Sequence, residues 1–174
     1  MQAAEQQKTF INPHTGDRLI IVKDTLSTKG SLLGMEAIYK QTKEFAPEHY
    51  HPFQEERFEV LSGTLRTKIN GKVRDFQAGE VFVIPVGTPH GMHNAHEEPV
   101  HFSWEIRPAL RSEAMFTRLY ESLHTNKLDK KGRPSLKVTL SILSDFQREF
   151  RLTAIPLFLQ KIIFGVIGIL YKQK

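Results

Sequence analysis

Seven short runs of β-forming residues follow one another between residues 18 and 107, and this succession constrains the fold most. The runs are rich in β-branched and aromatic residues and are separated by turn signals. Asn70-Gly71, between two of them, is typical of a two-residue hairpin. Closely spaced antiparallel strands of this kind predict a β-sandwich or barrel. The runs are RLIIVK (18–23), LLGMEAIYK (32–40), RFEVLS (57–62), TLRTKI (64–69), KVRDF (72–76), EVFVIP (80–85) and VHFSWEI (100–106).

The hydrophobic pattern changes after Pro108 from a strand period to a helix period. Apolar residues recur at helical spacing in 109–124 and again in 135–150. A third, strongly apolar helix is expected within 155–171. We therefore expect a barrel over residues 1–108, followed by an extension at 109–174 of about three helices that packs on the barrel or on a partner subunit.

Composition narrows the chemistry and the partners of the chain. With 174 residues it can build one core, and with no cysteine any metal must be held by nitrogen and oxygen. Residues 1–110 carry 12 Lys and Arg against 14 Asp and Glu, a net charge of −2, whereas 111–174 carry 12 against 5, a net of +7. The positive charge is spread along helical segments without a recognition motif, so we expect no nucleic-acid partner. The start, MQAAEQQKTF, has no apolar signal segment, and we expect a cytoplasmic protein.

The stretch PEHYHPFQEERFEVLSG, at 47–63, holds a candidate metal site. His49 and His51 are two residues apart, so in an extended segment both side chains emerge on one face. Glu56 shares its strand parity with Phe58 and Val60, which indicates that its carboxylate points inward. A carboxylate on an inward face is costly unless something compensates its charge, and a metal ion is the usual compensation.

A second stretch, GEVFVIPVGTPHGMHN at 79–94, completes a resemblance to the cupin superfamily. The first stretch is similar to the first cupin motif: His-x-His, four residues, Glu, six residues, Gly. The second is similar to the second motif: Gly, five residues, Pro-x-Gly, two residues, His, three residues, Asn. The one departure is Lys43, where the family's first motif opens with a glycine. The matching residues are His49, His51, Glu56 and Gly63 in the first motif, and Gly79, Pro85, Gly87, His90 and Asn94 in the second.

The resemblance implies a mainly β fold, a jelly-roll barrel, with one divalent transition metal per chain. The metal would be held by His49, His51, Glu56 and His90, and Fe, Mn, Ni, Cu and Zn all suit such ligands. Four protein ligands leave one or two coordination positions free for a substrate oxygen or another small molecule. We expect a metal-dependent enzyme, dioxygenase-like, that acts on a small oxygen-chelating organic substrate. The sequence identifies no separate catalytic residue.

Strand parity also predicts a pocket wall near the metal. In VHFSWEI, Phe102 and Trp104 alternate with polar residues and are expected to face into the barrel. These side chains either line a substrate pocket or simply form core. His93 and His96, beside the second motif, are expected in exposed turns. The expected wall consists of Phe58, Val60, Phe82, Ile84, Phe102 and Trp104.

Two alternatives to a dioxygenase-like enzyme remain open. One is a non-enzymatic module that binds or senses a small ligand, and the other is a sugar isomerase or epimerase, because cupins host many unrelated functions. The segment at 155–174 has three interpretations as well. It is expected to be buried against the barrel or at a homodimer interface; contact with a membrane surface is a second possibility, and a membrane span, which needs ~20 apolar residues, is the third.

Overall fold

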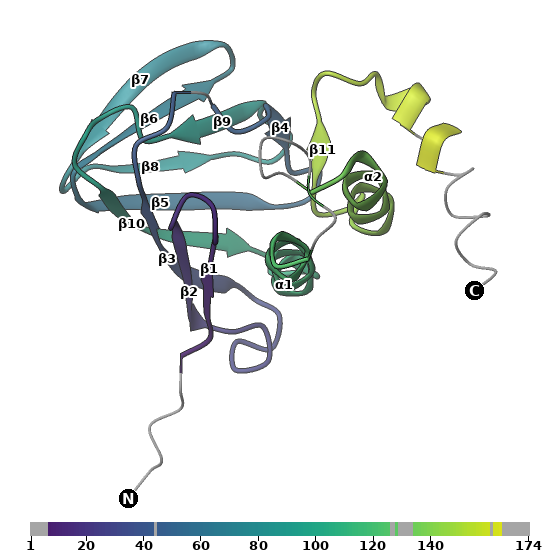
Figure 1. The fold of residues 1–174 in the computed structure, drawn as a ribbon, viewed down its shortest axis with the longest axis horizontal. Helices are drawn as coiled ribbons and strands as arrows, with labels where there is room; N and C mark the ends of the chain where they lie inside the picture. Colours follow the sequence, from purple (N-terminus) through teal and green to yellow (C-terminus); the bar gives the residue numbers. More distant parts are fainter. Residues whose placement is uncertain (1–6, 44, 126–127, 129–133, 161, 165–174) are drawn as a thin grey trace, which may run out of the picture.

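The computed structural model describes residues 7–43, 45–125, 128, 134–160 and 162–164 and has the predicted mainly β architecture. Two antiparallel sheets face each other as a jelly roll (Figure 1), one ordered β1-β2-β3-β10-β5-β8 and the other β11-β4-β9-β6-β7. The strands are β1 (Thr9–Ile11), β2 (Arg18–Lys23), β3 (Leu33–Tyr39), β4 (His49–Tyr50), β5 (Glu55–Ser62), β6 (Thr64–Ile69), β7 (Lys72–Gln77), β8 (Val81–Ile84), β9 (His90–His93), β10 (Val100–Arg107) and β11 (Arg151–Leu152).

The inner faces of the two sheets carry the core. Burial alternates along β5 and β10, so that Phe58, Val60, Phe102 and Trp104 are buried as their parity predicted. Aromatic rings continue this core between the sheets: Phe82 stacks on Phe58 at 4.9 Å and on Phe76 at 4.0 Å between ring centroids. The alternation of apolar and polar residues therefore predicts which face of β5 and of β10 points inward.

Two motif residues hold turns that position the site. Gly63 has φ of +76°, and a Cβ there would lie 2.6 Å from the carbonyl oxygen of Pro99, so only glycine fits. Gly87 has φ of +74°, and its amide donates to the carbonyl oxygen of His51 at 2.9 Å. The turn of the second motif is thereby bonded directly to the histidine pair of the first.

The extension after Pro108 contains α1 (Ser112–Leu123) and α2 (Leu136–Asp145), and helical residues at 157–160 and 162–164. Two predicted boundaries were wrong. Leu110 has φ of +46°, outside the right-handed helical region, so α1 begins at Ser112 and not at 109. The helix predicted to reach residue 150 ends at Asp145, because the chain beyond it turns back and β11 pairs with β4.

This pairing puts the end of the extension against the barrel. Leu152 is the register partner of His49, and Arg151 that of Tyr50. Thr153 adds a bond from its hydroxyl to the carbonyl oxygen of Glu48 at 2.9 Å. Figure 1 shows β11 at the end of the barrel that α1 and α2 adjoin. The boundary proposed at residue 108 thus separates segments that share a sheet.

The last helical segment is buried on one side only. Gln160 and Phe164 are buried, whereas Leu157, Phe158 and Ile162 are exposed. The rest of the helix predicted within 155–171 lies outside the described residues. Among the residues the structure describes, no helix is long and apolar enough to cross a membrane, and the span considered for 155–174 extends into residues that it does not describe. Membrane-surface contact and a homodimer stay predictions.

Candidate metal centre

Four predicted site residues meet between the two sheets. His49 lies on β4, His51 directly follows it, and His90 lies on β9, all from one sheet, while Glu56 lies on β5 in the other. The three histidines offer ligand atoms within 4.8 Å of one another. Glu56 approaches two of them, with Oε1 3.2 Å from Nε2 of His51 and Oε2 2.8 Å from Nε2 of His90. The residues predicted to bind metal are thus brought to one point.

Backbone carbonyl groups orient all three imidazoles. Nδ1 of His49 lies 2.9 Å from the oxygen of Pro47, and Nδ1 of His90 lies 2.8 Å from that of Thr88. Nδ1 of His51 bonds to the oxygen of Glu149. A carbonyl oxygen only accepts, so each neutral imidazole carries its proton on Nδ1 and leaves the Nε2 lone pair free. This is the tautomer that a metal ligand requires.

The atoms that meet at the centre are therefore acceptors without a donor. Nε2 of His51, Nε2 of His90 and Oε2 of Glu56 are buried and have no hydrogen-bond partner. Two such acceptors repel each other at 2.8 Å unless a proton or a metal cation lies between them. Ligands at right angles around an ion with bonds of about 2.1 Å lie about 3.0 Å apart, close to the 2.8 and 3.2 Å observed. The donor set fits a divalent metal ion.

The electrostatics of the centre favour a charged carboxylate and neutral His49. Glu56 is fully buried, which raises the pKa of its carboxyl, yet its contacts with His51 and His90 hold that pKa well below its usual range. Burial lowers the pKa of His51, but the charge of Glu56 and the hydrogen bonds to Glu56 and to the Glu149 carbonyl outweigh it and raise that pKa. Burial lowers the pKa of His49 to about 3, with a further contribution from the neighbouring His90. Trp104 donates from Nε1 to Oε1 of Glu56 at 2.9 Å and fixes the orientation of the carboxylate. Trp104 was predicted as pocket wall, and it contacts a candidate ligand.

The C-terminal extension supplies contacts that the sequence did not predict. The Phe150 ring stacks on the ring of His49, with 4.3 Å between centroids and 19° between planes. The preceding residue, Glu149, supplies the carbonyl that accepts from His51. Its own side chain is buried and accepts from the Arg111 amide at 3.2 Å, which ties it to the start of α1. Two of the three histidines are therefore held partly by the extension.

Two hollows of the described structure lie elsewhere than the predicted wall. One, of about 350 Å³, lies over β6 and β7 and is lined by Thr67, Ile69, Asn70, Lys72, Arg74 and Phe76. The six residues of the predicted wall line neither hollow, and all six are buried in the core. Whether any of them contacts a substrate stays a prediction.

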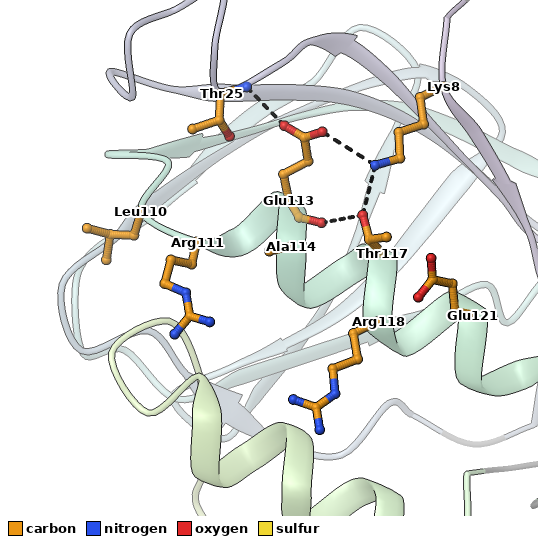
Figure 2. A pocket seen from close by; sticks show the side chains of 9 residues that line it. All are labelled: Lys8, Thr25, Leu110, Arg111, Glu113, Ala114, Thr117, Arg118 and Glu121. Carbon is orange, nitrogen blue, oxygen red and sulfur yellow. Dashed lines mark hydrogen bonds and ion pairs between the residues drawn. The ribbon is translucent and has the colours of Figure 1, made fainter. Parts of the chain in front are cut away.

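The other hollow, of about 570 Å³, runs along α1 (Figure 2). Its polar side chains are paired with one another: Glu113 accepts from the Thr25 amide at 3.1 Å and lies 3.5 Å from Lys8, which also donates to Thr117 at 2.9 Å. Arg118, at its edge, is paired with Asp145. This hollow therefore offers few free polar groups to a ligand.

His93 was predicted in an exposed turn, and that prediction was wrong. It is buried on β9, where its ring packs 4.2 Å from the ring of Phe45, and its Nδ1 lies 3.1 Å from the carbonyl oxygen of Thr42. Its strand position puts it on the face of β9 opposite to His90. His96 is partly exposed and lies 3.3 Å from Asp75.

Comparison with known proteins agrees with this geometry. Residues 37–105 match the family model of the cupin domain. This part of the chain is a cupin domain. Solved structures share its fold: an RmlC-like cupin from Shewanella frigidimarina has a TM-score of 0.52 at 16% identity, over 65% of this chain and 94% of that one. A predicted oxalate decarboxylase from Thermotoga maritima has a TM-score of 0.52 at 17% identity, over 59% and 92%.

Two further proteins similar to this chain differ in their described activities. A sugar phosphate isomerase of the cupin superfamily from Silicibacter pomeroyi has a TM-score of 0.50 at 15% identity, over 62% of this chain and 74% of that one. A protein named polyketide synthase CurC, from Streptomyces cyaneus, is 25% identical over 91 residues. That match covers 52% of this chain and 58% of the length of the relative. The likeness to the solved structures concerns the fold alone.

Proposed function

We propose that this cupin is a metal-dependent enzyme that acts on a small organic substrate through chelating oxygens, in the manner of a dioxygenase. The observation that carries the proposal is the meeting of buried acceptors without donors at His51, His90 and Glu56. His49, whose pKa is lowered to about 3, is a neutral ligand at physiological pH. A divalent ion held by these four residues would supply Lewis-acid or redox chemistry to a chelated substrate.

The residues around the centre have separate roles in this proposal. The three backbone carbonyls keep the proton of each imidazole on Nδ1. Trp104 orients the Glu56 carboxylate, and the Phe58 and Phe82 rings beneath it exclude water. Exclusion of water strengthens each electrostatic contact at the centre. The metal's free positions are then available to the substrate.

The first test is the metal content of the purified protein, measured by elemental analysis. The wild type is compared with a His49→Ala/His90→Ala double variant, whose fold is checked by circular dichroism. We expect about one equivalent of a divalent transition metal in the wild type and its loss in the variant. Equal metal content in both, or no uptake by either after reloading, contradicts the metal site.

The second test separates an enzyme from a binding module. The metal-loaded protein is offered chelating substrates with dioxygen, and oxygen consumption is followed with an electrode. Turnover that the double variant lacks supports the enzyme. Tight binding of the same compounds without oxygen uptake or any product supports the ligand-binding alternative. Iron, manganese, nickel or copper in the protein favours dioxygen chemistry, whereas zinc favours an isomerase or another non-redox role.

A further inference from the structure

A single row of paired residues crosses the sheet that holds the histidines. The strand register runs from Leu152 on β11 to His49, His90, Ile69 and finally Lys72 on β7. Directly paired residues point to the same face of a sheet, and their side chains are neighbours. We call these five residues the His90 row. His49 and His90, in the middle of the row, belong to the candidate metal centre. Leu152 lies next to His49 on one side, and Ile69 lies next to His90 on the other.

The two ends of the His90 row differ in accessibility. At one end β11 is paired with β4, and the Phe150 ring covers His49. At the other end Ile69 and Lys72 line the hollow of about 350 Å³ over β6 and β7. Ile69 is also the direct register partner of His90. None of the candidate ligands lines this hollow and His90 is buried, so Ile69 is the residue that separates the hollow from the centre.

The chemistry of this hollow indicates what it accepts. Ile69 and Phe76 give it an apolar floor, and Lys72 and Arg74 put positive charge at its edge. Arg74 is already paired with Glu80 at 2.7 Å and lies over the ring of Phe76. Within the described part of the chain the Lys72 ammonium makes no ion pair. Lys72 is the cation still available to a ligand.

We propose that the substrate is a small acid, whose oxygens chelate the metal beside His90 while its distal carboxylate binds Lys72 over the β6–β7 hollow. The inference rests on the proposed function and adds the substrate class and the residue that selects it. Two strand spacings, about 10 Å, separate the His90 and Lys72 positions in the sheet. An aromatic ring with one acidic substituent fits between them. A charge-assisted bond to the ammonium then adds to chelation.

The test uses two matched chelators and the full-length, metal-loaded protein. 4-Methylcatechol and 3,4-dihydroxyphenylacetate chelate through the same oxygens, and only the second carries a distal carboxylate. Their Kd values are measured by isothermal titration calorimetry for the wild type, Lys72→Gln and Lys68→Gln, with metal content checked each time. Lys68 is the matched control, because it lies on the opposite face of the same hairpin and is paired with Glu48 at 3.1 Å.

The expected result is a preference for the acid of about tenfold in the wild type and in Lys68→Gln. Lys72→Gln should lose this preference and bind 4-methylcatechol as the wild type does. Equal Kd values for the two chelators in the wild type, or an unchanged preference in Lys72→Gln, would overturn the inference. If metal-loaded wild type binds neither chelator, the proposed oxygen-chelating function itself fails, and the inference fails with it.

Discussion

The stacking of Phe150 on His49 gives the sharpest test that the C-terminal extension belongs to the metal centre. Phe150→Leu removes the ring while keeping most of the apolar volume, so the fold should change little. Aromatic pairs contribute about 0.5–1.5 kcal/mol beyond the area they bury. If that energy holds His49 in its ligating orientation, metal affinity should fall about two- to twelvefold. The two rings qualify as such a pair because their centroids are 4.3 Å apart and their planes differ by 19°.

Metal affinity would be measured by competition with a coloured chelator, and the Co²⁺-loaded protein would be compared by its visible ligand-field spectrum. Phe146→Leu is the matched control, since Phe146 is buried in the same extension but packs on the Arg111 guanidinium, 4.6 Å from the centre of its ring. We expect lower affinity and a shifted spectrum for Phe150→Leu only. Wild-type affinity in Phe150→Leu, or equal losses in both variants, would refute the positioning role of Phe150.

Three other substitutions test the centre and its supporting turn. Glu56→Gln keeps the volume but removes the anionic ligand, so metal affinity should fall on the order of a hundredfold or more, measured as metal retained after dialysis. Trp104→Phe removes the donor to Glu56, and urea titration should show a loss of about 1–3 kcal/mol. Gly63→Ala meets both a positive φ and the Pro99 oxygen at 2.6 Å. It should lower Tm by several degrees more than Gly71→Ala, which has the same φ of +76° and no atom within 4 Å of the added Cβ.

The alternation of residues along β5 predicted that the side chain of Glu56 points into the barrel. Glu56 shares its face with Phe58 and Val60, and all three are buried. The two motifs predicted which histidines meet, because their spacing corresponds to strands that the fold pairs, and His49 and His90 are register partners. His93 shows the limit of local reasoning: its neighbourhood looked like a turn, but β9 continues through it.

The predicted pocket wall shows a second limit. Parity separates inward from outward residues, and every residue of that wall is indeed inward and buried. It does not tell which inward residues are left uncovered by the opposite sheet. Phe58 and Phe82 fill the space between the sheets by stacking, whereas Ile69 and Lys72 border open space at the edge of the barrel. That difference depends on which residues of the two sheets come together, and the sequence of a single strand does not show it.

The contribution of the extension was hidden from sequence for a physical reason. His51 is oriented by the backbone carbonyl of Glu149, and every residue type has that group, so no side-chain pattern marks it. β11 has two residues, too few for an alternation to stand out. Phe150 looked like one more apolar residue of a helix, yet it lies past the end of α2 and covers His49. A cupin motif thus predicts which side chains meet at the candidate centre, while the chain outside the motif supplies contacts that orient and cover them.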